Sequence, residues 1–212
     1  MKYPRTPHLP WSPGMSNDDR VIRPYDLAEL SASPTTITEK MDGGNVTLMR
    51  DCFYARSLDS GTPVWEKYAK SMWSRIAHDI PDGWRISAES VWAQRSVAYT
   101  DLPGPLLVFG VWDSNSLLSW SDTLEWADLL GLPTVPVIGK STGVEHAHSL
   151  WRRTRDETVS EGFVVRDSRA IPVAEFPRRV AKWVREGHVQ TDAAWRHRST
   201  FPTNMVAHPP CT

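Results

Sequence analysis

The stretch TTITEKMDGGNVTLMR, residues 35–50, sets a lysine and an acid beside a Gly-Gly pair, between two segments of β-forming residues. The run TTIT before the lysine and the alternating Val46 and Leu48 after it are typical of strands. Gly43-Gly44 is a hairpin signal between them. We therefore expect a β-hairpin with Lys40 near its tip, where a firmly held backbone can aim the side chain. A single Lys-x-Asp-Gly is also typical of a solvated turn, so the rest of the chain must decide.

The composition is that of an ordinary globular protein. Of the 212 residues, 40% are hydrophobic and 23% are charged, which is enough for one sizeable core. No apolar run approaches the roughly 20 residues that span a bilayer, and prolines interrupt the first 14 residues, where a secretory signal would be apolar. Cys52 and Cys211 are far apart and form no C-x-x-C pair. We expect a cytoplasmic protein with no disulfide framework, no cysteine zinc site and no membrane partner.

The net charge of −1 hides an asymmetry along the chain. Residues 1–150 carry 13 basic against 18 acidic residues, whereas residues 151–212 carry 11 against 7. A polyanion could bind the basic clusters of this C-terminal third, although arginine-rich helix faces are also commonly just solvated. If RNA binds there, the expected contacts are Arg152, Arg153, Arg178 and Arg179.

The order of patterns predicts one domain with short extensions. Residues 1–34 hold six of the 17 prolines and little periodicity, so we expect an extended arm that lies over a domain of residues 35–195, followed by a tail of residues 196–212. Further strands are expected at 52–57, 84–92, 106–113, 134–138, 162–167 and 179–185, and helices at 64–79, 121–131 and 143–157. Strands outnumber helices and come in bunches, which favours an α+β fold of antiparallel sheets flanked by helices.

Two of the expected helices allow finer predictions. In helix 64–79, aromatic and aliphatic side chains recur at helical spacing and should face the core: Trp65, Tyr68, Met72 and Ile76. In helix 121–131, Ser121 is the expected N-cap and Gly131 the stop.

Two motifs point to functions that we reject. GKST, residues 139–142, lacks the first glycine of a phosphate-binding loop, because Thr134 stands there and a strand-like VPVI follows. His146 and His148 are two residues apart, so on a helix they point about 200° apart and do not share a metal.

Six stretches resemble, in order, the motifs of ATP-dependent RNA ligases. TEKMDGGN is similar to the K-x-D-G-x-N motif I, ARS to motif Ia, and AESVWAQRSVAY to motif III. VFGVWD is similar to motif IIIa, EGFVVR to motif IV, and AKWVREGHVQTD to motif V. The resemblance runs from about residue 35 to 195 and implies a nucleotidyltransferase fold, an ATP-grasp-like adenylation domain.

The chain departs from the family pattern at a few positions. Ala88 replaces the usual glycine of motif III, Arg95 replaces the usual histidine, and motif V offers Lys182 with Arg185 where many relatives have K-x-K. Little sequence follows residue 195, so we expect that the separate C-terminal domain of many ligases is absent.

The resemblance implies a reaction for Lys40. Its amine would attack the α-phosphate of ATP, expel pyrophosphate and form lysyl-AMP; AMP would then pass to an RNA 5′-phosphate, and a 3′-OH would displace it. An unperturbed lysine is neutral only about once in several thousand molecules at pH 7, so nearby cations must favour the neutral amine. The implied catalytic residues are Lys40, Asp42, Arg56 and Lys182.

The resemblance also implies binding residues for ATP and for a metal. The nucleotide-binding set is Glu39, Lys40, Asn45, Arg56, Glu89, Phe109, Glu161, Lys182 and Arg185. Glu89 would contact the ribose and Glu39 the adenine edge. Asp42, Glu89 and Glu161 offer the oxygen ligands that Mg²⁺ prefers, held through water, with Mn²⁺ as an alternative. The implied partners are ATP and RNA ends bearing 5′-phosphate and 3′-OH.

The aromatic that stacks on adenine has two candidates. Phe109 and Trp112 are three apart on a strand, so they should face opposite sides, and only one can line the pocket. The resemblance favours Phe109 and leaves Trp112 for the core, although a bulge at Gly110 would reverse the facing.

Two other functions are compatible with the motifs. One is a related nucleotidyltransferase that adenylates or caps ends without joining them. The other is a non-catalytic module that binds RNA ends, although such a binder would not need Lys40.

Overall fold

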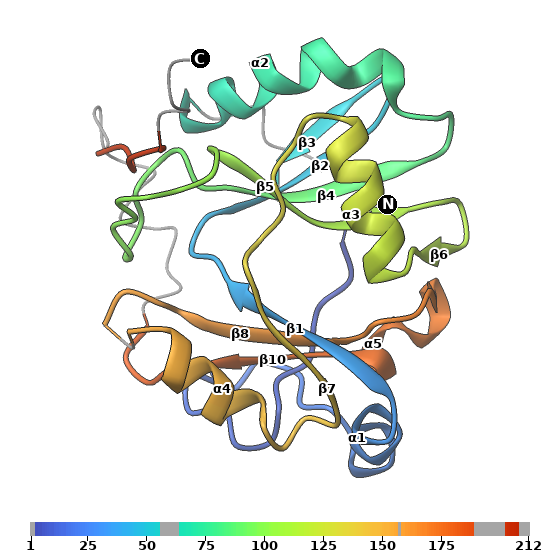
Figure 1. Cartoon of the computed structure of the whole chain (residues 1–212), viewed down its shortest axis with the longest axis vertical. Helices are drawn as coiled ribbons and strands as arrows, with labels where there is room; N and C mark the ends of the chain where they lie inside the picture. The colour runs from blue at the N-terminus through green and yellow to red at the C-terminus, as the bar shows by residue number, and fades with distance from the viewer. Residues whose placement is uncertain (1–2, 56–63, 157, 189–201, 208–212) are drawn as a thin grey trace.

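The computed structural model describes residues 3–55, 64–156, 158–188 and 202–207, which form two β-sheets with helices on their outer sides (Figure 1). The first sheet joins, in order, β10 (Val180–Val184), β8 (Gly162–Asp167), β1 (Pro34–Lys40) and β7 (Val137–Thr142). The second sheet joins β3 (Phe53–Ala55), β2 (Gly44–Leu48), β4 (Arg85–Ser90), β5 (Leu106–Trp112), β6 (Ser116–Leu117) and β9 (Ile171–Pro172). Neighbouring strands are antiparallel throughout both sheets, which confirms the predicted α+β class.

Each sheet has its own core beneath its own helices. The second sheet packs against α2 (Lys67–Ile76) and α3 (Trp120–Leu129) around buried residues such as Val46 and Ile86. The first sheet packs against α1 (Pro24–Ser31) and α4 (Ala147–Thr154) around Ile37 and Phe163. Shorter pieces complete the described elements: η1 (Val64–Glu66), η2 (Ala77–Asp79), η3 (Val173–Glu175) and α5 (Phe176–Arg179).

The expected hairpin over residues 35–50 is wrong. β1 belongs to the first sheet and β2 to the second, so the chain crosses from one sheet to the other at residues 41–43 (Figure 1). A hairpin and a crossing both read as strand, short link and strand, which is why the local pattern did not separate them. Lys40 ends β1 opposite Gly162 of β8, and Gly44 begins β2 opposite Ser90 of β4.

The two glycines of the crossing serve close approach instead of a turn conformation. Neither has a positive φ, in contrast to Gly83 or Gly131. A Cβ on Gly43 would lie 2.5 Å from the carbonyl oxygen of Ser90, and one on Gly44 would collide with the Glu66 carboxylate. The glycines therefore let the crossing pass directly against β4 and the start of α2.

The predicted helices differ from the observed ones in their ends and in one exposed face. Helix α3 begins at Trp120, and Ser119, not Ser121, caps it by accepting a hydrogen bond from the Asp122 amide at 3.1 Å. Gly131 follows the helix with φ of 64°, as expected of its stop. Tyr68 was expected to face the core, but it is 43% exposed and lies outside the core.

Two other predicted segments are shifted. The strand expected at 134–138 is β7, Val137–Thr142, so GKST is itself part of a strand and does not wrap a phosphate. The helix expected at 143–157 is the shorter α4, and residue 157 lies outside the described part.

The N-terminal segment carries more structure than its prolines indicate. Residues 7–14 run beside β10: Leu9 N donates to Lys182 O at 2.8 Å, Lys182 N to Pro7 O at 2.9 Å, and Gly14 N to Val184 O at 3.0 Å. After this arm, Pro24 starts α1, a helix that the low periodicity of residues 1–34 did not predict. The arm thus extends the edge of the first sheet.

The described part of the tail, residues 202–207, is hydrogen-bonded to the segment between β4 and β5. Asn204 donates from its side-chain amide to Val91 O at 2.8 Å and accepts from the Tyr99 amide at 2.9 Å. Residues 202–207 therefore hold the loop between β4 and β5. No helix in the described ranges has both the length and the apolar composition that crossing a membrane requires.

We expect Gly43→Ala to lower the free energy of unfolding by about 1–3 kcal/mol, because the new methyl group meets a backbone oxygen that β4 holds in place. The matched control is Gly139→Ala on β7, whose Cβ would meet only the movable Leu150 side chain at 3.3 Å. Thermal unfolding of both variants measures the difference. Equal melting temperatures for the two would contradict the close-approach role of Gly43.

Candidate active site

A cavity of about 620 Å³ opens where the chain crosses between the sheets. Its walls come from strands of both sheets and from the N-terminal arm. The lining includes most of the residues predicted from the motifs: Glu39, Lys40, Asp42, Asn45, Glu89, Phe109, Glu161 and Lys182. Among these residues, Glu39 and Lys182 are 143 positions apart in the sequence and yet line one cavity.

Lys40 and Glu161 form the ion pair at the centre of the cavity. Lys40 is the last residue of β1, and Glu161 directly precedes β8, whose first residue, Gly162, pairs with Lys40. The register of the two strands therefore brings the side chains together, and the Lys40 Nζ donates to Glu161 Oε1. The carboxylate is buried, whereas the lysine is 24% exposed toward the cavity.

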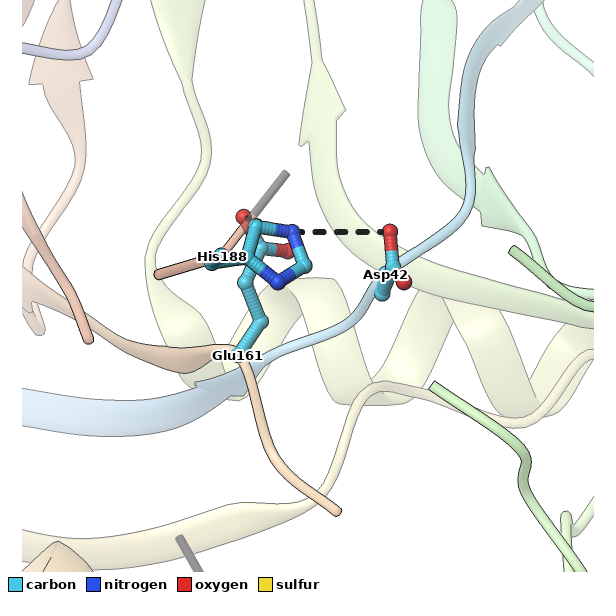
Figure 2. Close-up of side chains that lie close together, drawn as sticks. All are labelled: Asp42, Glu161 and His188. Atoms are coloured by element: carbon cyan, nitrogen blue, oxygen red, sulfur yellow. Dashed lines mark ion pairs between the residues drawn. The ribbon is translucent and has the colours of Figure 1, made fainter. Parts of the chain in front are cut away.

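Figure 2 shows that Asp42, Glu161 and His188 point toward one another. His188 Nε2 lies 3.3 Å from Glu161 Oε1 and 3.7 Å from Asp42 Oδ1. The histidine side chain is only 2% exposed. One potential ligand atom from each residue falls within 4.8 Å of the others, which makes this trio a candidate metal centre among the described residues.

Hydrogen bonds fix the position of Asp42. Its Oδ2 accepts from the Val97 amide at 2.8 Å, and its own amide donates to the Tyr99 hydroxyl at 2.8 Å. Burial raises the pKa of Tyr99 well above its ordinary value, so the phenol stays neutral. The loop after β4 therefore presents Asp42 to the cavity in one orientation.

Glu89 lies on β4, opposite Asn45 of β2. Burial is the main cause that raises its pKa to about 7, while Lys40 and Arg95 partly oppose this rise. It is not a member of the Asp42, Glu161 and His188 trio. A carboxyl group with this pKa is mostly protonated below neutral pH.

The other predicted nucleotide contacts have different positions. Glu39 Oε2 accepts from the Arg155 side chain at 2.6 Å. Lys182 Nζ lies 3.8 Å from Asp19 of the arm. Arg185 does not belong to the cavity lining; its Nε donates to Ser160 O at 3.0 Å. Arg56 lies outside the described residues.

The expectation that Phe109 and Trp112 face opposite sides is wrong. Ser87 pairs with Gly110 and Ala88 with Val108, so Phe109 is an extra, bulged residue. Both rings contact Tyr3, with ring centroids 5.0 Å and 5.7 Å away. Phe109 nevertheless lines the cavity, and Trp112 is fully buried among Leu117, Ile171, Phe176 and Val180.

The four arginines expected to contact RNA divide into two pairs. Arg152 and Arg153 lie exposed on α4. Arg178 pairs with Asp26 of α1 at 3.7 Å, and Arg179 lies within 4 Å of three acids, Glu29, Asp167 and Glu175. The second pair thus joins α5 to neighbouring elements. Acids of the protein itself pair with these two arginines, so their charges do not require a ligand.

Sequence reasoning missed several cavity residues. His188 stood in the motif V stretch, where its spacing from Lys182 carried no signal of its own. Arg5 and Arg20 come from the arm, and no motif marks them. Among the lining residues that the structure describes, they are the cations with neither a side-chain hydrogen bond nor an acid partner.

Comparison with known proteins gives two results. A family model described as RNA ligase matches residues 33–184. A search of curated proteins found no match.

Solved ligase structures share the fold. An archaeal ATP-dependent RNA ligase is 20% identical with a TM-score of 0.61, over 87% of this chain and 48% of that one. A putative ATP-dependent DNA ligase from Aquifex aeolicus is 18% identical with a TM-score of 0.56, over 87% and 50%. A mutant Naegleria gruberi RNA ligase with ATP and Mn is 11% identical with a TM-score of 0.53, over 76% and 52%. The chain spans about half the length of these proteins.

We expect the metal-free, nucleotide-free protein to lose stability through Glu89 as the pH rises. Because the folded pKa of about 7 exceeds the ordinary 4.5, the native state holds a proton that the unfolded state has lost. The penalty is absent below pH 4.5, grows between 4.5 and 7, and is complete above 7. Glu89→Gln should therefore be more stable than wild type at pH 8, by up to about 3 kcal/mol, and similar at pH 4.5.

Thermal unfolding of both proteins at several pH values, with a chelator present, measures this difference. Titratable groups other than Glu89 cancel in the comparison. A stability difference that does not change with pH would contradict the raised pKa.

Proposed function

Because the chain belongs to the RNA ligase family, we propose that it is an ATP-dependent RNA ligase that joins a 5′-phosphate to a 3′-OH through a lysyl-AMP intermediate. The observation that carries this proposal is the position of Lys40. It ends β1 at the cavity, contacts the buried Glu161, and shares the cavity with Glu89, Phe109 and Lys182. A lysine in a solvated turn would have no such surroundings.

In the proposed first step, Lys40 Nζ loses a proton to solvent, attacks the α-phosphorus of ATP as the neutral amine, and loses a second proton to solvent as the phosphoramidate forms. A bond forms between Nζ and the α-phosphorus, and the bond from that phosphorus to the bridging oxygen breaks, so pyrophosphate leaves with the electron pair. Glu161 Oε1, hydrogen-bonded to the amine, orients the nucleophile. Lys182, across the cavity, stabilises negative charge that develops on the α-phosphate.

The remaining nucleotide contacts follow from the walls of the cavity. Phe109 is proposed to stack on adenine, with Glu39 at the adenine edge, and Asn45 and Glu89 near the ribose. Arg185 does not contact the nucleotide in this scheme. Its side chain donates a hydrogen bond to the carbonyl of Ser160, the residue before Glu161, and so helps to position Glu161. Arg56 retains the catalytic role that its motif implies.

The candidate metal centre fits a divalent cation. Asp42 and Glu161 offer the carboxylate oxygens that suit Mg²⁺, and His188 adds a nitrogen that suits Mn²⁺ as well. Glu89 is proposed to contact the metal through water from outside this trio. A bound cation would supply positive charge beside the phosphates of ATP.

The phosphate tail of ATP needs cations that are not already neutralised. Lys40 is paired with Glu161 and Lys182 with Asp19, whereas Arg5 and Arg20 have no acid partner among the described residues. We therefore assign Arg5 and Arg20 to the β- and γ-phosphates. The arm would then take part in the first step, whose leaving group is pyrophosphate.

The substrates that we propose are ATP and RNA ends with 5′-phosphate and 3′-OH. Because ATP and RNA must both be present where the protein acts, we propose the cytoplasm as its location. Adenylation without joining and RNA-end binding without catalysis are the alternatives, and the experiments below separate them from ligation.

We expect Lys40→Ala to abolish transfer of label from α-labelled ATP to the protein, because the other lysine among the described lining residues, Lys182, is paired with Asp19 and is assigned to charge stabilisation. Lys140→Ala, an exposed lysine on β7, is the matched control and should be labelled like wild type. A denaturing gel after incubation with Mg²⁺ or Mn²⁺ gives the readout. Label on the alanine variant would show that the nucleophile is another residue.

The same variant separates ligation from its alternatives. Lys40→Ala should still seal RNA that already carries a 5′-adenylate, because that step needs no lysine nucleophile. Wild-type protein that becomes labelled but never joins ends would support the non-joining transferase. Wild-type protein that binds RNA ends and takes no label would support the binding module.

We expect the double substitution of Arg5 and Arg20 by Ala to weaken ATP binding about ten-fold and AMP binding less than two-fold, because AMP lacks the β- and γ-phosphates. Calorimetry in the Lys40→Ala background avoids turnover. Asp18→Asn is the control: it removes a negative charge from the same part of the lining and should not weaken ATP binding. Equal losses for ATP and AMP would contradict the assignment.

A further inference from the structure

An exposed pair of stacked aromatic rings lies at the start of α2. Tyr68 and Trp92 stack with ring centroids 4.6 Å apart and planes 12° from parallel. Tyr68 is 43% exposed, and Val64, four residues before it, is 62% exposed. One face of the tyrosine ring is covered by Trp92, and the exposed part of Tyr68 is available to another flat group. Aromatic rings that stay exposed in this way are typical of binding surfaces.

The solvent face of α2 is basic. Lys67, Lys70 and Arg75 are exposed, and no residue of α2 from Lys67 to Ile76 is acidic. The opposite face of the helix packs on the second sheet through Ala69 and Met72. The eight residues from Tyr68 to Arg75 span about 10 Å along the helix axis, so all three cations of this basic face lie within about that axial distance of Tyr68.

The other helix on the second sheet gives the contrast. α3 carries three exposed acids, Asp122, Glu125 and Asp128, and no basic residue. Of the two helices on this sheet, α2 therefore has the basic face, and that face lies beside the stacked rings.

The stacked rings are outside the cavity lining, but residues near them in the sequence lie at the cavity. Trp92 lies between Glu89 and Arg95, which both line the cavity. Glu66, two residues before Tyr68, reaches the backbone of Gly44 at the start of β2. A strand that entered the cavity past Arg95 would thus meet Tyr68 and the cations of α2.

We propose that the Tyr68–Trp92 stack and the basic face of α2 bind the RNA strand, with an unpaired base near its end stacked on Tyr68 and its phosphates along Lys67, Lys70 and Arg75. This inference rests on the proposed function, because it names the surface that holds the RNA end for ligation. A nucleobase fits the exposed aromatic face, and the phosphates fit the cations. A protein partner would need an apolar surface, but the solvent face of α2 around Tyr68 is charged.

The surface competes with the one that net charge alone suggests. α4 carries Arg152 and Arg153, but its tryptophan, Trp151, is fully buried, and the His148 ring packs against Trp151 and Trp183. α4 therefore offers phosphate contacts and no exposed Tyr, Trp or Phe ring on which a base could stack. The two helices make different predictions for the same RNA.

The first test measures the affinity for a labelled single-stranded RNA with a 5′-phosphate, by fluorescence anisotropy in the Lys40→Ala background. Tyr68→Ala should weaken binding about five-fold or more, and Tyr68→Phe, which keeps the ring, should restore it to within two-fold of the parent. Tyr25→Ala, an exposed tyrosine on α1, is the matched control and should bind like the parent. Far-UV spectra and melting temperatures verify that each variant is folded.

The second test asks whether a base, and not only charge, contacts Tyr68. RNAs with one abasic nucleotide at each of the first four positions are compared against the parent and Tyr68→Ala. At the position that stacks, the abasic site should weaken binding to the parent, and Tyr68→Ala should then add little. Additive losses at every position would overturn the stacking assignment.

Charge reversal distinguishes the two helices. Lys67→Glu with Lys70→Glu should weaken RNA binding and its salt dependence more than Arg152→Glu with Arg153→Glu. The reverse order, or normal RNA affinity in Tyr68→Ala, would overturn this proposal even if wild-type protein forms lysyl-AMP. Absence of lysyl-AMP in the wild type would instead contradict the proposed function, and the RNA-binding results would report on the surface alone.

Discussion

The short crossing between Lys40 and Gly44 joins the last residue of a strand in one sheet to the first residue of a strand in the other. Only residues 41–43 connect the two sheets here, and hydrogen-bonded ladders hold both ends, Lys40 opposite Gly162 and Gly44 opposite Ser90. So short a link leaves little freedom in how the sheet ends meet. The cavity forms at that meeting, and Lys40 stands in it because it is the last residue before the chain leaves the first sheet.

The charges around this crossing are balanced in a way that suits an anionic nucleotide. Glu161 is shared by Lys40 and His188, and Glu39 is held by Arg155, so most buried acids have a cation near them. Glu89 instead has a raised pKa, because burial disfavours its charged form. An incoming phosphate group therefore meets few uncompensated negative charges. The arm adds cations to the same wall, so a segment outside the two sheets contributes to the proposed ATP site.

The sequence predicted the strands and the members of the cavity better than their connections. Periodicity located β8 and β4 because alternation is a local property, and motif order brought Lys40 together with Glu161. Pairing between strands is not local, so the crossing was mistaken for a hairpin. The bulge at Phe109 likewise breaks the alternation of side chains along β5, so the prediction that Phe109 and Trp112 face opposite sides failed. His188 and the arm entered the site through tertiary packing, which no spacing in the sequence records.

Peptide mapping by mass spectrometry determines whether Lys40 becomes covalently adenylated. Protein incubated with ATP and Mg²⁺ is digested at a pH that preserves the phosphoramidate bond, with unreacted protein as the reference. We expect a mass increase of one adenylyl group on the peptide that contains Lys40, reversed when pyrophosphate is added. An adenylyl group on another residue, or an unmodified Lys40 peptide under conditions in which RNA ends are joined, would contradict the role of Lys40 as the nucleophile.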